Sequence, residues 1–402
     1  MTVDLWTDNY KKQCFLSCTV QWVEDYSVKQ NAHFCELFQP SVKSAENIKK
    51  QLITSLGNYV ISNEVIRSSV VFVSDRGANI KKSLEQFNWL PCSCHVLNII
   101  LFHAFNISAE ESNENSEQDD NIGCVQILLT AVKDLVTCLK RRGYASLLKS
   151  TIIQECVTRW NTKLAVLISV NKAFSKIQAI LQEKIQEQRL EGIDIALMED
   201  LIKLLMPFKH ISDATEGDKY PTLHCVLLRK RKLVDHCKCS MPDSKIIQIL
   251  KSWVDSLIQE KWIDYNLYKI ALFLFPKFKS MSILTKAGAQ DVPSVVRSIL
   301  KEENFRSLVD NETNFEHCYN SQLALPCKMS KTCSGADYVL ELNEYADAAP
   351  EYEIDEVEKY ILVDFSGDAI ANPSQKEHTG GFDILNFWKE HQIKYPKLSK
   401  LA

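Results

Sequence analysis

Residues 108–121, SAEESNENSEQDDN, divide the chain into two parts with different hydrophobic patterns. The stretch holds six acidic residues, no basic residue and no large apolar residue. Because such a composition buries too little apolar surface to offset the entropy lost on ordering, it predicts a disordered acidic loop. Short aromatic and β-branched runs precede the loop, and helical periodicity follows it. The chain is therefore predicted to join an α/β part to an all-helical part.

The part before the loop, residues 1–107, alternates strand and helix signals. The stretches VDLWTD, FLSCTVQWV and HFCELF are rich in aromatic and β-branched residues, as strands are. SAENIKKQLITSL then carries an amphipathic helical pattern, with Ser44 as a candidate N-cap. SSVVFVSD is a short apolar run suited to a central strand buried on both faces. These signals predict an α/β fold, a mixed sheet flanked by helices.

The part after the loop is predicted to be a helical insertion domain over residues 122–328, because its segments repeat an amphipathic 3.6-residue pattern. Residues 329–381 lose this periodicity and turn acidic. They are predicted to form a mostly irregular linker, in which DEVEKYILVDF has the pattern of a short helix. Residues 382–402 are predicted to form an amphipathic helix that ends at Tyr395-Pro396, followed by the start of a second helix.

The composition narrows the class of protein. Hydrophobic residues make up 46% and charged residues 24% of the 402 residues, which is typical of globular domains. The net charge of -4 excludes a uniformly basic surface but allows local basic patches. No run approaches about 18 consecutive apolar residues, and the N-terminus lacks the apolar core of a signal peptide. We therefore expect no membrane partner, a reducing compartment and free thiols for most of the 14 cysteines.

Two aspartates, Asp4 and Asp75, lie at or near the ends of strand-like runs. If the two strands are neighbours in one sheet, both carboxylates emerge at the same edge. Paired carboxylates suit Mg²⁺, and two such ions about 4 Å apart can clamp the attacking and leaving oxygens of a phosphodiester. The residues alone leave a plainer alternative open, in which Asp75 caps the helix beginning at Gly77 and Asp4 is solvated.

Two groups of cysteine and histidine also carry potential ligands. Cys92, Cys94 and His95 in LPCSCHVLN offer soft ligand atoms, but a structural zinc site takes about four ligands. Hydrogen-bonded structural roles are the favoured interpretation of this group. The second group either forms a metal site or spreads over several faces of one helix. It comprises His224, Cys225, His236, Cys237 and Cys239.

Basic and aromatic residues provide candidate DNA contacts. The densest basic run is Arg229, Lys230, Arg231 and Lys232. Phosphate contacts need such clusters, although solvated helix faces explain most charge runs. Arg159 and Trp160 in ECVTRWNT place an indole among polar neighbours. There the tryptophan either stacks on an unpaired base or anchors the packing of a helix.

Five motifs occur in an order that resembles the hAT superfamily of DNA transposases, the group containing hobo, Activator and Hermes. They are VDLWTDNYKK, VSDRGANIKKSL, CSCHVLN, ECVTRWNT and FWKEHQIKYPKLSKLA. The resemblance covers nearly the whole chain and is densest at its two ends. It implies a ribonuclease-H-like mixed sheet flanked by helices and interrupted by a large all-helical insertion.

The resemblance also implies roles for individual residues. Asp4 and Asp75 match the family's first two catalytic aspartates, which bind a divalent metal such as Mg²⁺ or Mn²⁺. Cys92 and His95 match a C-x-x-H motif close to the DNA, and Arg159 with Trp160 matches a motif implicated in stabilising a flipped base. The C-terminal stretch matches the start of the region that mediates dimerisation. Its residues of interest are Phe387, Trp388, Tyr395, Pro396 and Leu398.

The chain also departs from the family pattern. The family's catalytic glutamate follows the YPKLSKLA-type stretch, and no residue before Ala402 matches it; a BED zinc finger is absent before Asp4. We therefore expect a nuclear or cytoplasmic transposase-derived protein that is catalytically inactive and has no small-molecule substrate. It would hold its ancestor's metal weakly or not at all, and would retain self-association, pairing with related hAT proteins or weak DNA binding. The alternative is a metal-dependent transposase subunit whose glutamate is encoded in a longer form of the gene.

Overall fold

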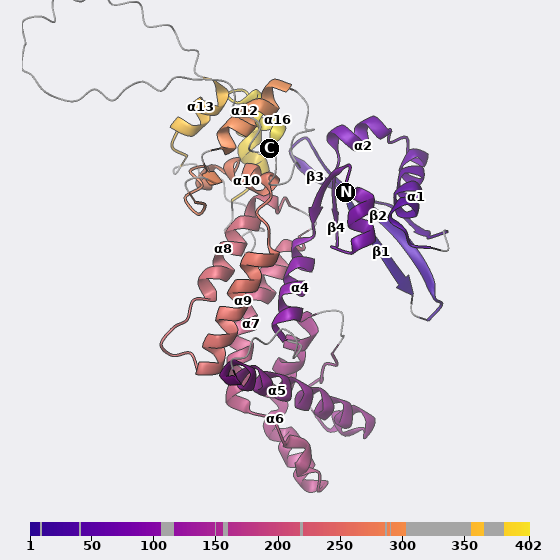
Figure 1. The fold of residues 1–402 in the computed structure, drawn as a ribbon, viewed down its shortest axis with the longest axis vertical. Coiled ribbons are helices and arrows are strands. Elements are labelled where there is room, and N and C mark those ends of the chain that lie inside the picture. Colours follow the sequence, from indigo (N-terminus) through magenta and orange to yellow (C-terminus); the bar gives the residue numbers. More distant parts are fainter. Residues whose placement is uncertain are drawn as a thin grey trace, which may run out of the picture.

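The structure, a computed structural model, joins a sheet and its covering helices to a long helical body (Figure 1). This arrangement confirms the predicted combination of an α/β part with an all-helical part. The residues that it describes are 1–8, 10–39, 42–105, 116–148, 150–155, 160–217, 220–285, 288–289, 291–302, 355–365 and 382–402.

The sheet is mixed, as predicted, and has five strands in the order β3-β2-β1-β4-β5. The first three strands form an antiparallel meander, whereas β4 runs parallel to both β1 and β5. The segment NWLP was not predicted as a strand, but it pairs with β4 along its full length. The strands are β1 (Thr2–Asp8), β2 (Gln13–Glu24), β3 (Ser27–Leu37), β4 (Val71–Ser74) and β5 (Asn88–Pro91).

Helices α1 (Ala45–Asn58), α2 (Asn63–Ser69) and α3 (Ala78–Leu84) accompany the sheet. The predicted N-cap of α1 is confirmed, because the Ser44 side chain accepts a hydrogen bond from the backbone N–H of Asn47. These helices pack on one face of the sheet around a core that includes Leu16, Ile48 and Phe72. The other face of β1 is therefore left to the rest of the molecule.

The predicted acidic loop is partly wrong. Residues 106–115 lie outside the described residues, but α5 (Ser116–Arg141) begins inside the stretch that was predicted to be a loop, so residues 116–121 are helical. A helix tolerates an acidic sequence in its first turns, because the positive end of the helix dipole lies there. Low hydrophobicity alone therefore does not identify a loop.

The helical body confirms the amphipathic pattern that follows the loop. Short 3₁₀ turns connect several of its helices: η1 (Tyr144–Leu147), η2 (Glu187–Leu190), η3 (Leu223–Cys225) and η4 (Pro276–Phe278). Most of the predicted linker, within 303–354 and 366–381, lies outside the described residues, but α13 (Glu356–Leu362) confirms the predicted short helix. The other helices are α4 (Ser93–Phe105), α6 (Trp160–Glu183), α7 (Ile195–Thr215), α8 (Val226–His236), α9 (Lys245–Lys261), α10 (Asn266–Phe273) and α12 (Val292–Glu302).

The boundary between the two hydrophobic cores lies earlier in the chain than the change in composition. The core of the helical body starts at Leu90 and takes in α4, which packs along α7 and α9 (Figure 1). Helix α4 buries Val96, Leu97 and Ile100 in that core. The helix thus connects the end of β5 directly to the helical body, and its first turn lies at the junction of the two parts.

One helix in the described part of the chain, α6, is long and apolar enough to cross a membrane. Half of its most apolar window is buried inside the protein. Leu164, Val170 and Leu181 of this helix pack in the helical core. Length and composition alone do not separate a membrane span from such a core helix.

The C-terminal helices α15 (Ile384–His391) and α16 (Pro396–Leu401) fold back onto the helical body. The residues predicted for dimerisation lie mainly inside this core rather than on a surface. Pro396 is exposed, whereas Phe387, Trp388, Tyr395 and Leu398 are buried. Their dimerisation role stays a prediction, and their observed partners belong to the same chain.

Candidate functional site

The sheet register brings Asp4 and Asp75 to the same level. Thr2 lies opposite Val73 in the parallel β1–β4 pair. Asp4 is two residues beyond Thr2, and Asp75 is two residues beyond Val73 and one beyond the end of β4, so the register carries both acids toward the same edge of the sheet. Residues opposite each other in parallel strands project to the same face. The sequence prediction that the two acids belong to neighbouring strands is therefore confirmed.

The Asp75 carboxylate is held by the turn that follows it. One oxygen, Oδ1, accepts a hydrogen bond from the backbone N–H of Gly77 at 3.1 Å. Gly77 occupies the N-cap position of α3, and no side chain caps this helix. Asp75 bonds to the N–H of the N-cap residue itself, so it does not cap the helix in the predicted way. A Cβ atom at Gly77 would approach Asp75 Oδ1 to 3.2 Å, and glycine avoids this close contact. The Arg76 guanidinium anchors the turn by donating to the carbonyl of Lys261 at 3.0 Å.

Ser74, the last residue of β4, connects Asp75 to the start of α4 through hydrogen bonds. Its hydroxyl donates to the Asp75 carbonyl at 2.8 Å and accepts from the indole N–H of Trp89 at 2.9 Å. Its own carbonyl accepts from the backbone N–H of Cys92 at 2.8 Å. These three bonds fix the beginning of α4, with Cys92 and His95, beside the end of β4.

A cleft of about 880 Å³ lies between the sheet and the helical body. Several elements that are distant in the sequence contribute polar side chains to it. Among the lining residues are Asp4 from β1, Cys92 and His95 at the start of α4, Trp160 from α6 and Glu216 at the end of α7. The cleft therefore contains both acidic and potentially cationic groups.

Cys92 and His95 are joined by a hydrogen bond that favours a charged thiolate and a charged imidazole. Hydrogen bonds from the Cys94 thiol and from His95 lower the pKa of Cys92 to about 4, against the opposing effect of burial. The bond to Cys92 raises the pKa of His95, and the negative charges of Asp75 and Asp4 raise it further. The hydrogen bond that Cys94 makes to Cys92 raises the pKa of the Cys94 thiol, and burial raises it further. This arrangement agrees with the hydrogen-bonded interpretation of the motif and sets the His95 imidazole beside the two acids.

Cys92 should react with iodoacetamide at a rate that is nearly constant between pH 6 and pH 9. Its pKa of about 4 leaves it deprotonated throughout this range, whereas an ordinary thiol gains about tenfold in thiolate per pH unit below its pKa of ~8.5. Mass spectrometry of the labelled peptides measures this rate. His95→Gln removes the imidazole, whose hydrogen bond and charge both lower the pKa of Cys92, and should make the labelling of Cys92 depend on pH. A tenfold rise per unit in the unaltered protein would contradict the ion pair.

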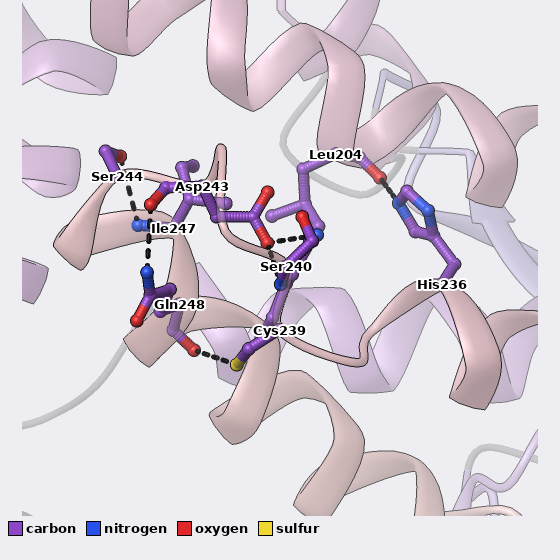
Figure 2. A network of polar contacts seen from close by, with 9 residues as sticks. Leu204, His236, Cys239, Ser240, Asp243, Ser244, Ile247 and Gln248 are labelled. Atoms are coloured by element: carbon purple, nitrogen blue, oxygen red, sulfur yellow. Dashed lines mark hydrogen bonds and ion pairs between the residues drawn. The ribbon is translucent and has the colours of Figure 1, made fainter.

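The second cysteine and histidine group does not converge on a metal. Figure 2 shows His236, whose Nε2 lies 3.0 Å from the Leu204 carbonyl, and Cys239, whose thiol donates to the Gln248 carbonyl at 3.6 Å. His224 is buried near the start of α8, and this burial lowers its pKa to about 3. Within the described ranges, no group of three or more His, Cys, Asp or Glu side chains can hold a metal ion. The metal-site alternative for this group is therefore wrong there.

The basic run on α8 does not form one phosphate-binding patch. Arg229 is buried and donates to the Thr215 hydroxyl at 3.2 Å. Lys230 pairs with Asp264 at 2.6 Å, and the exposed Arg231 pairs with a carboxylate on its own helix. Lys232 is exposed. Because consecutive helical residues point about 100° apart, the four cations spread around the helix. The DNA-contact role of these four residues stays a prediction.

Trp160 begins α6 and is buried in the helical core, so the packing interpretation of this residue is confirmed. Its backbone N–H donates to the Asn98 side chain at 3.1 Å, which joins α6 to α4 at the cleft. Its role in holding a flipped base stays a prediction. Arg159 lies outside the described residues.

Two cleft residues were missed by the sequence analysis. Asn98 follows His95 by three positions, the helical spacing that places both on one side of α4. Glu216 accepts a hydrogen bond from the Ser212 hydroxyl at 3.2 Å. It ends α7, where a carboxylate opposes the helix dipole. An acidic residue at the C-terminal end of a predicted helix is unfavourable, and this position could have marked Glu216 as a candidate functional residue.

The chain is similar to DNA transposases, and these curated homologues are hAT transposases, which confirms the resemblance of the five motifs. No family model matches the chain. One relative is the transposable element hobo transposase of Drosophila melanogaster, 26% identical over 278 residues, which make up 68% of this chain and 40% of the relative.

Two relatives from Zea mays match along the full length of the chain. The putative AC transposase is 21% identical over 443 residues, and the putative AC9 transposase is 20% identical over 467 residues. The matches cover 50% and 51% of these two proteins. The chain thus spans about half the length of the curated relatives it matches.

Proposed function

We propose that the chain is a transposase-derived protein of the hAT family that binds DNA at the cleft between its sheet and its helical body. The observation that carries this proposal is the β1–β4 pairing, which brings the strand of Asp4 beside the strand that ends just before Asp75, with Asp4 lining the cleft. We also propose that the sheet is a ribonuclease-H-like core. The strand order, with three antiparallel strands followed by two parallel ones, supports this assignment. Binding of DNA implies a nuclear location.

The donor set at the sheet edge fits a divalent cation in part. Asp4 and Asp75 offer carboxylate oxygens, the ligands preferred by Mg²⁺ and Mn²⁺, and such ions complete their shell with water and phosphate. A bound ion would polarise a phosphoryl oxygen. Among the described residues no third carboxylate joins the pair within reach of one metal. We propose that the chain binds DNA without cutting it.

His95 is proposed to contact a DNA phosphate in the cleft. It is exposed, and its raised pKa favours the imidazolium form beside Cys92. A cation in this position offsets the repulsion that the two aspartates would exert on a phosphate. The metal-dependent cutting subunit remains the second candidate function. The parallel pairing of β1 with β4, which carries both acids to one edge of the sheet, favours it. In that case a third carboxylate would come from outside the described residues.

Fluorescence anisotropy with a labelled duplex should show DNA binding that weakens as salt rises from 50 to 200 mM, since phosphate contacts release counterions. His95→Gln should weaken this binding several-fold. His103→Gln, at the far end of the same helix, is the matched control and should leave the affinity unchanged. A flat salt response, or equal effects of the two variants, would contradict the proposal.

The same DNA incubated with Mg²⁺ or Mn²⁺ distinguishes the two candidates. The binding protein should leave the strands intact, whereas the cutting subunit should release products that disappear in Asp75→Asn.

A further inference from the structure

The sheet carries an exposed aromatic pair on the face that holds Asp4. Trp6 is 43% exposed, and its ring stacks on Phe15 with centroids 4.7 Å apart and planes 21° apart. The two residues lie opposite each other in the β1–β2 pair. Side chains alternate along a strand, so Trp6 shares its face with Asp4 and lies about 7 Å further along β1.

The opposite face of the same sheet is covered instead. Leu5 and Val20 pack against the core beneath α1, which places their side chains on the far face from Trp6. Trp22 also belongs to that far face, because it is two residues beyond Val20 on β2. It is 42% exposed, nearly as much as Trp6. The two indoles are thus equally exposed on opposite faces of one sheet.

Cations border the end of the sheet that carries Trp6. Lys11 and Lys12 are exposed in the turn between β1 and β2, next to the exposed ring of Tyr10. Aromatic faces combined with cations are the two components by which proteins bind single-stranded nucleic acid.

We propose that Trp6 and Phe15, together with Lys11 and Lys12, form a platform on which unpaired bases of single-stranded DNA stack. This inference rests on the proposed function and extends it to a second contact region on the same face of the sheet. Stacking on Trp6 suits any base, because every base presents a π-face, and the lysines contact phosphates. A strand leaving the platform along β1 passes Asp4, so an unpaired end would be presented to the acidic pair.

The test compares a labelled oligothymidylate with a labelled duplex by fluorescence anisotropy. Trp6→Ala should weaken binding of the single strand by at least about fivefold and change duplex affinity by less than about twofold, since a stacked base is worth a factor of roughly 5 to 150. Trp22→Ala is the matched control and should leave both affinities unchanged. Trp6→Phe should restore most of the single-strand binding. Thermal unfolding of each variant confirms that it is folded.

A second measurement addresses the lysines. The double variant Lys11→Ala and Lys12→Ala should make the slope of log affinity against log salt shallower by about 1.4 for the single strand, the value expected for two phosphate contacts. An unchanged slope would show that these lysines do not contact the strand.

The outcomes separate the platform from the proposed function. Duplex and single-strand binding that survives Trp6→Ala, or that falls equally in Trp22→Ala, overturns the platform and leaves DNA binding at the cleft intact. Failure of the unaltered protein to bind either DNA overturns both. If Trp6→Ala instead lowers the mass measured by light scattering and leaves DNA affinity unchanged, the face binds a second copy of the chain, and the platform is again overturned.

Discussion

Replacing Trp388 by alanine is expected to lower the free energy of unfolding by about 3–5 kcal/mol. The side chain is 1% exposed, and its indole N–H donates to the Leu274 carbonyl at 3.1 Å. Its ring lies 5.5 Å from that of Tyr360, so it connects α15 to both the helical body and α13. Truncation would leave a cavity and an unpaired carbonyl in the core. Urea denaturation followed by circular dichroism measures the loss.

The control for this variant comes from the same segment. Ile393 is 93% exposed, and Ile393→Ala should change the stability by no more than about 0.5 kcal/mol. Light scattering adds the decisive comparison with the predicted dimerisation role. If Trp388→Ala keeps its full stability but loses self-association, Trp388 acts between chains. That result would contradict the stabilising role of its packing within one chain.

Asp243→Ala is expected to lower the free energy of unfolding by about 3 kcal/mol at pH 7, because it leaves the Lys251 ammonium buried without its counter-ion. The two side chains lie 2.7 Å apart and are 15% and 9% exposed, respectively. The carboxylate also accepts from the backbone N–H of Ser240 at 2.8 Å, within the network shown in Figure 2. Denaturation at several pH values measures both the size of the effect and its pH dependence.

The pH dependence follows from the direction of the pKa shift. The hydrogen bond from Lys251 is the main cause that lowers the pKa of Asp243 to about 2, below its ordinary value of ~3.9. A depressed folded-state pKa stabilises the protein above the unfolded-state pKa, and this contribution is lost as the pH falls toward 2. The difference between the protein and Asp243→Ala should therefore shrink below about pH 4. Asp235→Ala, which removes a more exposed carboxylate nearby, should lower the free energy of unfolding clearly less than Asp243→Ala does.

Local sequence patterns predicted the elements whose stabilising contacts are regular. Strands β1 to β4 follow aromatic and β-branched runs, and Ser44 caps α1 as expected. Strand β5 was missed because four residues ending in proline carry no periodicity. It is a strand because its partner β4 is present, with Val71 opposite Asn88 and Ser74 opposite Pro91. Tertiary pairing of this kind is not encoded in the segment itself.

The candidate site was predictable to a similar degree. The two acids were recognisable in the sequence because each accompanies a strand-like run. The structure adds that these two strands pair in parallel, with Thr2 opposite Val73. The sequence did not reveal that the four cations of the basic run on α8 point in different directions. It also did not reveal that Lys230 pairs with Asp264, which is distant in the sequence. The apolar pattern around Trp388 indicated a buried face, but a sequence pattern does not specify whether a face is covered by the same chain or by another one.

Binding of Mn²⁺, followed by electron paramagnetic resonance as the free ion disappears, tests most directly whether Asp4 and Asp75 share a cation. The unaltered chain should bind the ion, and both Asp4→Asn and Asp75→Asn should weaken the affinity by about tenfold or more, since each removes a charged ligand. Asp8→Asn, on the same strand and the same face, should bind as the unaltered chain does. Absence of binding, or an equal loss in Asp8→Asn, would show that the two carboxylates form no common site.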